Sequence, residues 1–173
     1  MVRKSLVCRS LLLTLVVIVG SCFYGPSVVR ADETLWEMGA QGGWSYNDDE
    51  ESFNQADIIV AYRLPLQWQR WDVLNASTRL TGMVSVLDGG GDTGLLGTLG
   101  LELLIGLGDS PFEFRTGGGA TLMSRYKYGD EDFGGAFQFT SHLGLEYHFL
   151  ESLSAFTRIQ HMSNAGIYSR TRG

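Results

Sequence analysis

The feature that most constrains this chain is a period-two alternation of apolar and polar residues that starts near Leu35 and recurs in seven successive segments. In the first segment every second residue from Trp36 to Tyr46 is apolar or glycine, while Glu37 and Ser45 belong to the polar set. Successive side chains of a strand point to opposite faces, so the alternation predicts strands with one apolar and one polar face. Glycine is abundant (23 residues) and proline scarce (3), which suits strands joined by tight turns.

The other six segments cover residues 56–64, 74–86, 95–107, 112–122, 137–149 and 153–167. We expect Pro65 to end the second segment and residues 68–71 to turn the chain. Residues 88–93 are expected to form a turn and residues 126–134 a polar loop. The connections after the first, third and fifth segments are polar and generally longer than the others, as at the outer end of bacterial outer-membrane barrels.

The composition of the two faces distinguishes a membrane barrel from a soluble β-domain. The apolar face is rich in Leu and Phe, as a lipid-facing band requires. The polar face combines Gly, Ser, Thr and Gln with charges of both signs that must pair in a barrel interior, namely Glu37, Arg63, Arg79, Glu102, Glu113, Arg115, Glu146 and Arg158. This pattern predicts an all-β fold, a small antiparallel outer-membrane β-barrel. Such barrels have an even number of strands, so we expect eight, with about seven present and the C-terminal one missing.

The N-terminal region has the features of a secretory leader. A basic start precedes an apolar run over 11–19, so residues 1–31 are expected to be a signal peptide and residues 32–173 the barrel domain. Processing as a lipoprotein at Cys22 is the alternative. Both cysteines, Cys8 and Cys22, lie in the leader, so we expect no disulfide in the barrel. The net charge of −6 argues against nucleic acid as a partner.

The seventh segment carries the strongest candidate for chemistry. His161 and Ser163 are two residues apart, so both side chains project from the apolar, lipid-facing side. A hydroxyl beside an imidazole is the minimal arrangement for a serine nucleophile, and polar groups in this position are costly unless they are functional. The order of the turns places the pair toward the outer leaflet. His142 and His148 fall on the polar face and are expected to form hydrogen bonds in the interior, and we expect neither a metal nor an organic cofactor.

The run His161-Met-Ser163-Asn164-Ala-Gly-Ile, preceded by Phe-Thr-Arg-Ile-Gln, resembles the signature of the lipid A 3-O-deacylases, also called acyloxyacyl hydrolases. The resemblance implies an eight-stranded outer-membrane barrel that hydrolyses the ester-linked acyl chain at the 3-position of lipid A. It also implies that Ser163 is the nucleophile, His161 the general base and Asn164 a contributor to the oxyanion site. Lipid A and outer-membrane lipids are the expected partners, and the pattern indicates no particular oligomeric state.

The sequence departs from the family pattern in one respect. The family completes its triad with a glutamate soon after this motif, whereas residues 164–173 contain no acidic residue, so the third triad member is unassigned. We expect a chain that is incomplete at its C-terminus, or an enzyme slowed by an unoriented His161. Two other functions stay open, a non-enzymatic outer-membrane barrel with a structural or adhesive role and a soluble secreted β-domain.

Overall fold

The computed structural model describes residues 11–15, 35–45, 52–70 and 73–168. Within these ranges no helix is long and apolar enough to cross a membrane. The strands are β1 (Leu11–Leu15), β2 (Trp36–Ser45), β3 (Phe53–Arg70), β4 (Leu74–Gly89), β5 (Asp92–Leu107), β6 (Phe112–Met123), β7 (Lys127–Tyr128), β8 (Glu131–Asp132), β9 (Phe137–Leu150) and β10 (Leu153–Ser163).

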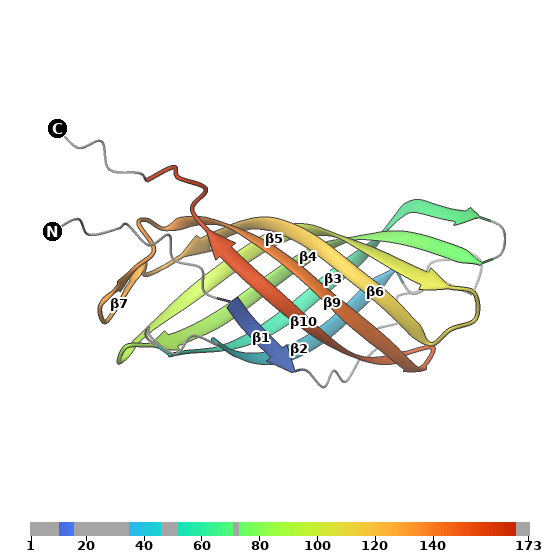
Figure 1. Ribbon diagram of the computed structural model, residues 1–173, viewed down its shortest axis with the longest axis horizontal. Coiled ribbons are helices and arrows are strands. Elements are labelled where there is room, and N and C mark those ends of the chain that lie inside the picture. Colours follow the sequence, from blue (N-terminus) through green and yellow to red (C-terminus); the bar gives the residue numbers. More distant parts are fainter. Residues whose placement is uncertain (1–10, 16–34, 46–51, 71–72, 169–173) are drawn as a thin grey trace, which may run out of the picture.

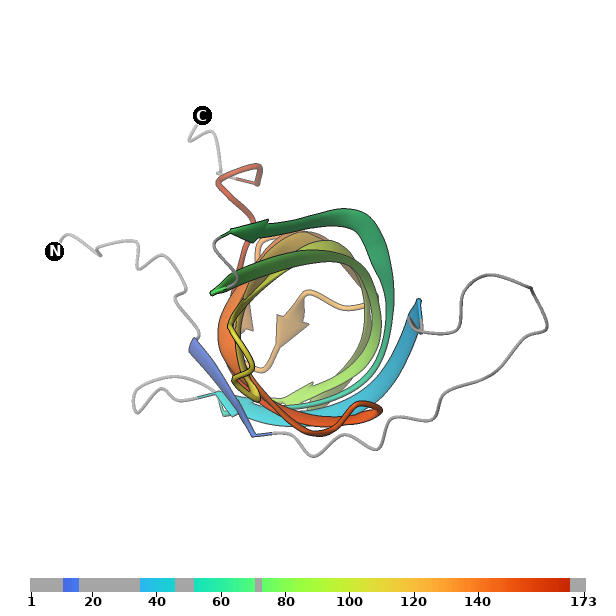
Figure 2. The same cartoon turned by 90° about the vertical axis from the view of Figure 1, so that its right-hand side faces the viewer.

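Eight of these strands form a closed antiparallel barrel in the order β1-β10-β9-β6-β5-β4-β3-β2 (Figures 1 and 2). The remaining two, β7 and β8, form a separate hairpin between β6 and β9. In Figure 1 this hairpin lies at the end of the barrel where β10 finishes. The predicted all-β barrel is therefore confirmed, and the seven alternating segments are β2, β3, β4, β5, β6, β9 and β10.

The two faces of the wall follow the parity expected from the sequence. In β10 the even-numbered residues from Phe156 to Met162 are buried, whereas Ile159 on the other face is 41% exposed. In β5 Glu102 is 2% exposed, while its neighbour Leu101 is 58% exposed. Polar groups thus face the interior, and aliphatic side chains form the outer surface, which is the reverse of a soluble domain.

The eighth position of the barrel is occupied by a segment of the expected leader. β1 pairs antiparallel with β10, where Leu11 lies opposite His161, and with β2, where Leu12 lies opposite Ser45. Figure 1 shows β1 as a short strand at this seam. The rest of the expected signal peptide lies outside the described residues. Its removal, and with it the boundary of the barrel domain, remains a prediction.

We expect the protein extracted from outer membranes to begin near Asp32, because residues 1–31 carry the pattern of a cleaved signal. Intact-mass spectrometry measures this directly. A mass that starts at Cys22 and includes acyl groups would indicate lipoprotein processing. A mass that includes Leu11–Leu15 would contradict the prediction and make β1 a permanent strand. If residues 1–31 are removed, another strand must close the seam, because open sheet edges are not tolerated in hydrocarbon.

The prediction that Pro65 ends the second segment is wrong. β3 continues to Arg70, with a register irregularity between Arg63 and Gln67 that contains the proline. Proline has no N–H to donate to the ladder, and a bulge is one of the few places in a sheet where it is tolerated. The expected turn at 68–71 consequently moves toward the C-terminus, and β4 begins at Leu74.

The connection between β4 and β5 is also tighter than expected from its polar composition. Only Gly90 and Gly91 join the two strands, with φ angles of 57° and 79°. These left-handed conformations suit glycine and a two-residue hairpin turn. The β4–β5 connection is as short as the two-residue turn between β9 and β10 at the opposite end of the barrel. The expected alternation of long and short connections therefore does not hold for the connection after the third segment.

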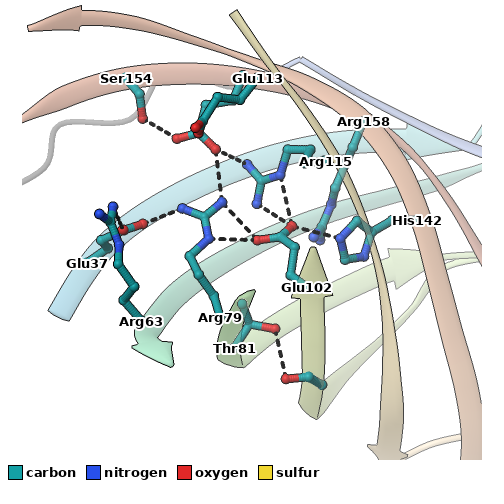
Figure 3. Close-up of polar contacts among 12 residues, drawn as sticks. Glu37, Arg63, Arg79, Thr81, Glu102, Glu113, Arg115, His142, Ser154 and Arg158 are labelled. Carbon is teal, nitrogen blue, oxygen red and sulfur yellow. Dashed lines mark hydrogen bonds and ion pairs between the residues drawn. The ribbon is translucent and has the colours of Figure 1, made fainter. Parts of the chain in front are cut away.

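The interior at mid-height is filled by a network of ion pairs (Figure 3). Arg79 binds Glu37, Glu102 and Glu146, with its Nη2 at 2.9 Å from both Glu102 Oε2 and Glu146 Oε2. Arg115 Nη2 lies 2.7 Å from Glu102 Oε1, and Arg115 Nη1 lies 3.3 Å from Glu146 Oε2. The predicted pairing of interior charges is therefore confirmed. Because each charge faces a partner, burial costs less than it would for isolated ions.

Candidate active site

β10 brings His161 and Ser163 to the outer face of the barrel, at the end of the strand. Both side chains are partly exposed and alternate with the buried Gln160 and Met162, so the predicted orientation of the pair agrees with the structure. Across the strand pair His161 lies opposite Ser141, and Ser163 lies opposite Phe139. The two polar side chains therefore stand in a largely apolar outer surface, with the Ser141 hydroxyl as a polar neighbour across the strand pair.

The pair shares a face but is not joined by a hydrogen bond. Residues two apart in a strand are separated by roughly 6.6 Å between Cα atoms. Within the described part of the chain neither the His161 ring nor the Ser163 hydroxyl has a hydrogen-bond partner. Catalytic hydrogen bonds are often long in unliganded enzymes and shorten when substrate binds. The arrangement suits a serine–histidine pair that closes around an incoming ester.

Asn164 begins the segment after β10, and its side chain is held by two hydrogen bonds. Its Nδ2 donates to the Phe133 carbonyl at 3.0 Å, and its Oδ1 accepts from the Gly166 amide at 2.9 Å. The Ile167 amide donates to the Asn164 carbonyl at 2.9 Å, closing a turn in which Ala165 has a φ of 48°. A side-chain amide carries two N–H donors, so one remains for a ligand.

The carbonyl that receives the Asn164 amide belongs to an apolar plug. Phe133 packs edge-on against Tyr128 and Phe53 at centroid distances of 5.9 and 5.7 Å. Burial in this cluster raises the pKa of the Tyr128 phenol. We call the cluster the end plug, which consists of Phe53, Leu87, Leu96, Met123, Tyr128, Phe133 and Met162.

The end plug changes the interpretation of residues 126–134. The sequence predicts a polar loop there, whereas the structure contains the β7–β8 hairpin, with Tyr128 and Phe133 buried at 0% and 6% exposure. Figure 2 looks along the barrel axis and shows the hairpin across the far end. Tyr128 and Phe133 are flanked by polar residues, so the apolar–polar alternation of the sequence gives no sign that they are buried. The apolar inward-facing residues at the strand ends, such as Leu87 and Leu96, were the available signal.

The other two histidines face the interior, as expected. His142 Nε2 lies 2.8 Å from Glu102 Oε1, and His148 Nε2 lies 2.9 Å from Glu113 Oε2 (Figure 3 draws the first pair). Among the described residues no carboxylate hydrogen-bonds or pairs with His161. The structure therefore adds no acidic third member to the pair.

An open apolar groove of about 550 Å³ crosses the outer face of β3 to β6. Gly82, Gly97 and Ala120 are its small residues, and Leu122 and Phe137 are among the larger ones that line it. Ala120 is the register partner of Phe139, which in turn lies opposite Ser163. Through Phe137 the groove reaches β9, the strand next to β10, and its lining carries no charged side chains.

A comparison with protein families matches residues 56–173 to the family described as lipid A 3-O-deacylase (PagL). This match covers more than half of the chain and includes His161, Ser163 and Asn164. The chain belongs to the lipid A 3-O-deacylase family. The comparisons with curated proteins and with solved structures found no match.

Membership in the lipid A 3-O-deacylase family confirms the resemblance noted in the sequence. It makes the chain a hydrolase of the lipid A deacylase type and lipid A its class of substrate. Proteins of this family are outer-membrane β-barrels, and the barrel described above agrees with that architecture.

Proposed function

We propose that this lipid A 3-O-deacylase hydrolyses the 3-O-linked acyl ester with Ser163 as nucleophile and His161 as general base. The observation that carries the proposal is the position of these two polar side chains on the apolar outer face of β10. A hydroxyl and an imidazole are costly on a lipid-facing surface and mark a functional site there. No metal or organic cofactor has a role in this mechanism.

The chemistry follows from the two groups and their neighbour. His161 accepts the hydroxyl proton while Ser163 Oγ attacks the ester carbonyl carbon, and the carbonyl oxygen becomes an oxyanion. The Asn164 amide supplies a hydrogen-bond donor to that oxyanion. When the ester C–O bond breaks, His161 gives the proton to the leaving 3-oxygen of lipid A, which becomes a hydroxyl. Water, deprotonated by His161, then attacks the carbonyl carbon of the acyl-serine ester. The bond to Ser163 Oγ breaks, His161 returns the proton to Oγ, and the fatty acid is released.

The proposal places the site at the outer leaflet of the outer membrane. If residues 1–31 are removed, the longer of the remaining connections, 46–52 and 124–136, follow the ends of β2 and β6, at the end of the barrel where β10 finishes. In outer-membrane barrels the longer connections are external. Lipid A can then reach Ser163 from the membrane, and water can reach it from the interface. The apolar outer surface beside Phe139 offers contact for acyl chains.

The test uses the folded protein in detergent micelles with purified lipid A. We expect release of one hydroxy fatty acid, identified by mass spectrometry, with a matching loss from the lipid A mass. Release of a chain from another position would contradict the 3-O assignment. No release by a protein that migrates as a folded barrel would favour the non-enzymatic alternative.

Replacing Asn164 with alanine is expected to lower kcat about 100-fold, the usual effect of removing one oxyanion donor. The KM for lipid A should change little, because the donor acts on charge that develops in the transition state. Steady-state release of fatty acid measures both constants. An unchanged kcat would show that the Asn164 amide serves only its bonds to Phe133 and Gly166.

A further inference from the structure

The chain leaves the β7–β8 hairpin through residues 133–135, which we call the hairpin exit and which contact Asn164. The Phe133 carbonyl accepts a hydrogen bond from Asn164 Nδ2 at 3.0 Å, and Asn164 Oδ1 accepts one from the Gly166 amide at 2.9 Å. A side-chain amide has one acceptor oxygen and two N–H donors in one rigid group. With Oδ1 and one N–H engaged, the direction of the other N–H is fixed.

Gly134 leaves the space in which the Asn164 side-chain amide lies. Its φ angle is 84°, in the left-handed region that favours glycine. A Cβ placed on Gly134 would lie 2.7 Å from Asn164 Nδ2, closer than the two atoms can approach. Any other residue at this position therefore displaces the amide nitrogen.

The Phe133 carbonyl is itself held by a buried side chain of the barrel wall. Gln138 on β9 is 1% exposed, and its Nε2 donates to the Phe133 carbonyl at 3.2 Å and to the Gly135 carbonyl at 2.7 Å. The next residue of β9, Phe139, is the register partner of Ser163. The strand that pairs with the nucleophile therefore also holds the hairpin exit.

A second contact joins the segment after β10 to the hairpin exit. The Tyr168 hydroxyl accepts a hydrogen bond from the Phe137 amide at 3.2 Å. A Cβ placed on Gly135 would overlap the Tyr168 ring, so the ring packs against bare backbone. The segment is thus held at Asn164 and again at Tyr168.

We propose that Gly134 and Gln138 are positioning residues that orient the Asn164 side-chain amide toward the oxyanion. This inference rests on the proposed function of Asn164 as an oxyanion donor. Gln138 holds the Phe133 carbonyl, and that carbonyl engages one N–H of Asn164. Gly134 supplies the space, so the other N–H is already aimed when the ester arrives. A donor oriented in advance stabilises the oxyanion without reorganisation during the reaction.

The kinetic test compares Gly134→Ala with the wild-type protein on lipid A in micelles. We expect kcat to fall about 10-fold with KM unchanged, because the oxyanion forms only in the transition state. Gly91→Ala is the matched control, since Gly91 has a φ of 79° and a Cβ there would meet nothing within 4 Å. It introduces similar backbone strain and should keep the wild-type kcat. Equal kcat for Gly134→Ala and the wild type would overturn the inference.

Gln138→Met tests the same support without backbone strain. Methionine is similar in length to glutamine and has no N–H donor, so the Phe133 carbonyl loses one of its two donors. We expect kcat per folded protein to fall about 3- to 10-fold, with folding checked by heat-modifiable gel migration. An unchanged kcat would show that Gln138 has no positioning role.

Double variants distinguish positioning from general damage to the barrel. In an Asn164→Ala background neither Gly134→Ala nor Gln138→Met should lower kcat further, because no side-chain amide remains to be oriented. A fall as large as in the wild-type background would mean that the two residues act on another group. That result would overturn the inference.

A spectroscopic measurement separates this inference from the proposed function. The side-chain amide resonances of Asn164, identified by their loss in Asn164→Ala, report its hydrogen bonds. We expect them to shift in Gly134→Ala and Gln138→Met and to stay in place in Gly91→Ala. If they shift while Asn164→Ala keeps the wild-type rate, the amide is anchored as inferred and its proposed oxyanion role fails. If Asn164→Ala is slow but the resonances are unchanged in Gly134→Ala and Gln138→Met, the positioning role is wrong.

Discussion

We expect replacement of Ser163 with alanine to abolish lipid A deacylation and to leave the barrel folded. Without the hydroxyl no acyl-serine ester can form, so we expect kcat to fall at least about 1,000-fold, as in other serine hydrolases that lose the nucleophile. The Ser163 hydroxyl has no hydrogen-bond partner within the described residues, so its loss should cost little stability. Fatty acid release by equal amounts of folded protein measures the effect.

Two comparisons make the result for Ser163 interpretable. His161→Ala should lower kcat to a similar extent, and the double variant should be no slower than either single one, because the two groups act as a unit. Thr78→Val changes a hydroxyl of the outer face in β4 and should keep full activity. Heat-modifiable gel migration checks that every variant folds. A Ser163→Ala protein with substantial activity would mean that another residue attacks the ester.

The second large effect is expected at Glu102 in the interior. Its carboxylate accepts hydrogen bonds from Arg79 Nε at 3.1 Å and Arg115 Nη2 at 2.7 Å, and it lies 2.8 Å from His142 Nε2. Glu102→Ala leaves two buried guanidinium groups short of a counter-charge. Breaking a buried ion pair from one side costs about 3–5 kcal/mol.

Urea unfolding in micelles, followed by tryptophan fluorescence, measures the free energy of unfolding of Glu102→Ala. The matched control is Glu151→Ala, because Glu151 is an exposed carboxylate in the turn between β9 and β10. Surface substitutions of this kind usually change stability by less than about 0.5 kcal/mol. A loss at Glu102 no larger than at Glu151 would contradict a stabilising role for the interior network.

The parts of the fold that depend on local alternation could be predicted from the sequence. Parity alone assigned His161 and Ser163 to the outer face and His142 and His148 to the interior, because side-chain direction in a strand repeats every two residues. It did not predict the path of β3 past Pro65, since a bulge that accommodates a proline depends on the partner strand. The pairing of Leu11–Leu15 with β10 and β2 was missed because it joins segments distant in the chain.

The site was predictable only in part for the same reason. Residues 161–164 are consecutive and can be recognised in the sequence. The residues that contact them in space are set by the register of the strands and by the position of the hairpin. Ser141 becomes a neighbour of His161 through the pairing of β9 with β10. The Phe133 carbonyl meets Asn164 because the end plug anchors the hairpin. Neither contact has a local sequence signal.

Ser163 is the proposed nucleophile that removes the 3-O-acyl chain of lipid A in the outer membrane. The most direct test is mass spectrometry of lipid A from bacterial cells that express either the wild-type protein or Ser163→Ala at equal levels. We expect the wild type to produce lipid A lighter by one hydroxyacyl chain, lost from the 3-position, and Ser163→Ala to leave the lipid unchanged. Unchanged lipid A with the wild type, or the same loss with both proteins, would contradict the claim.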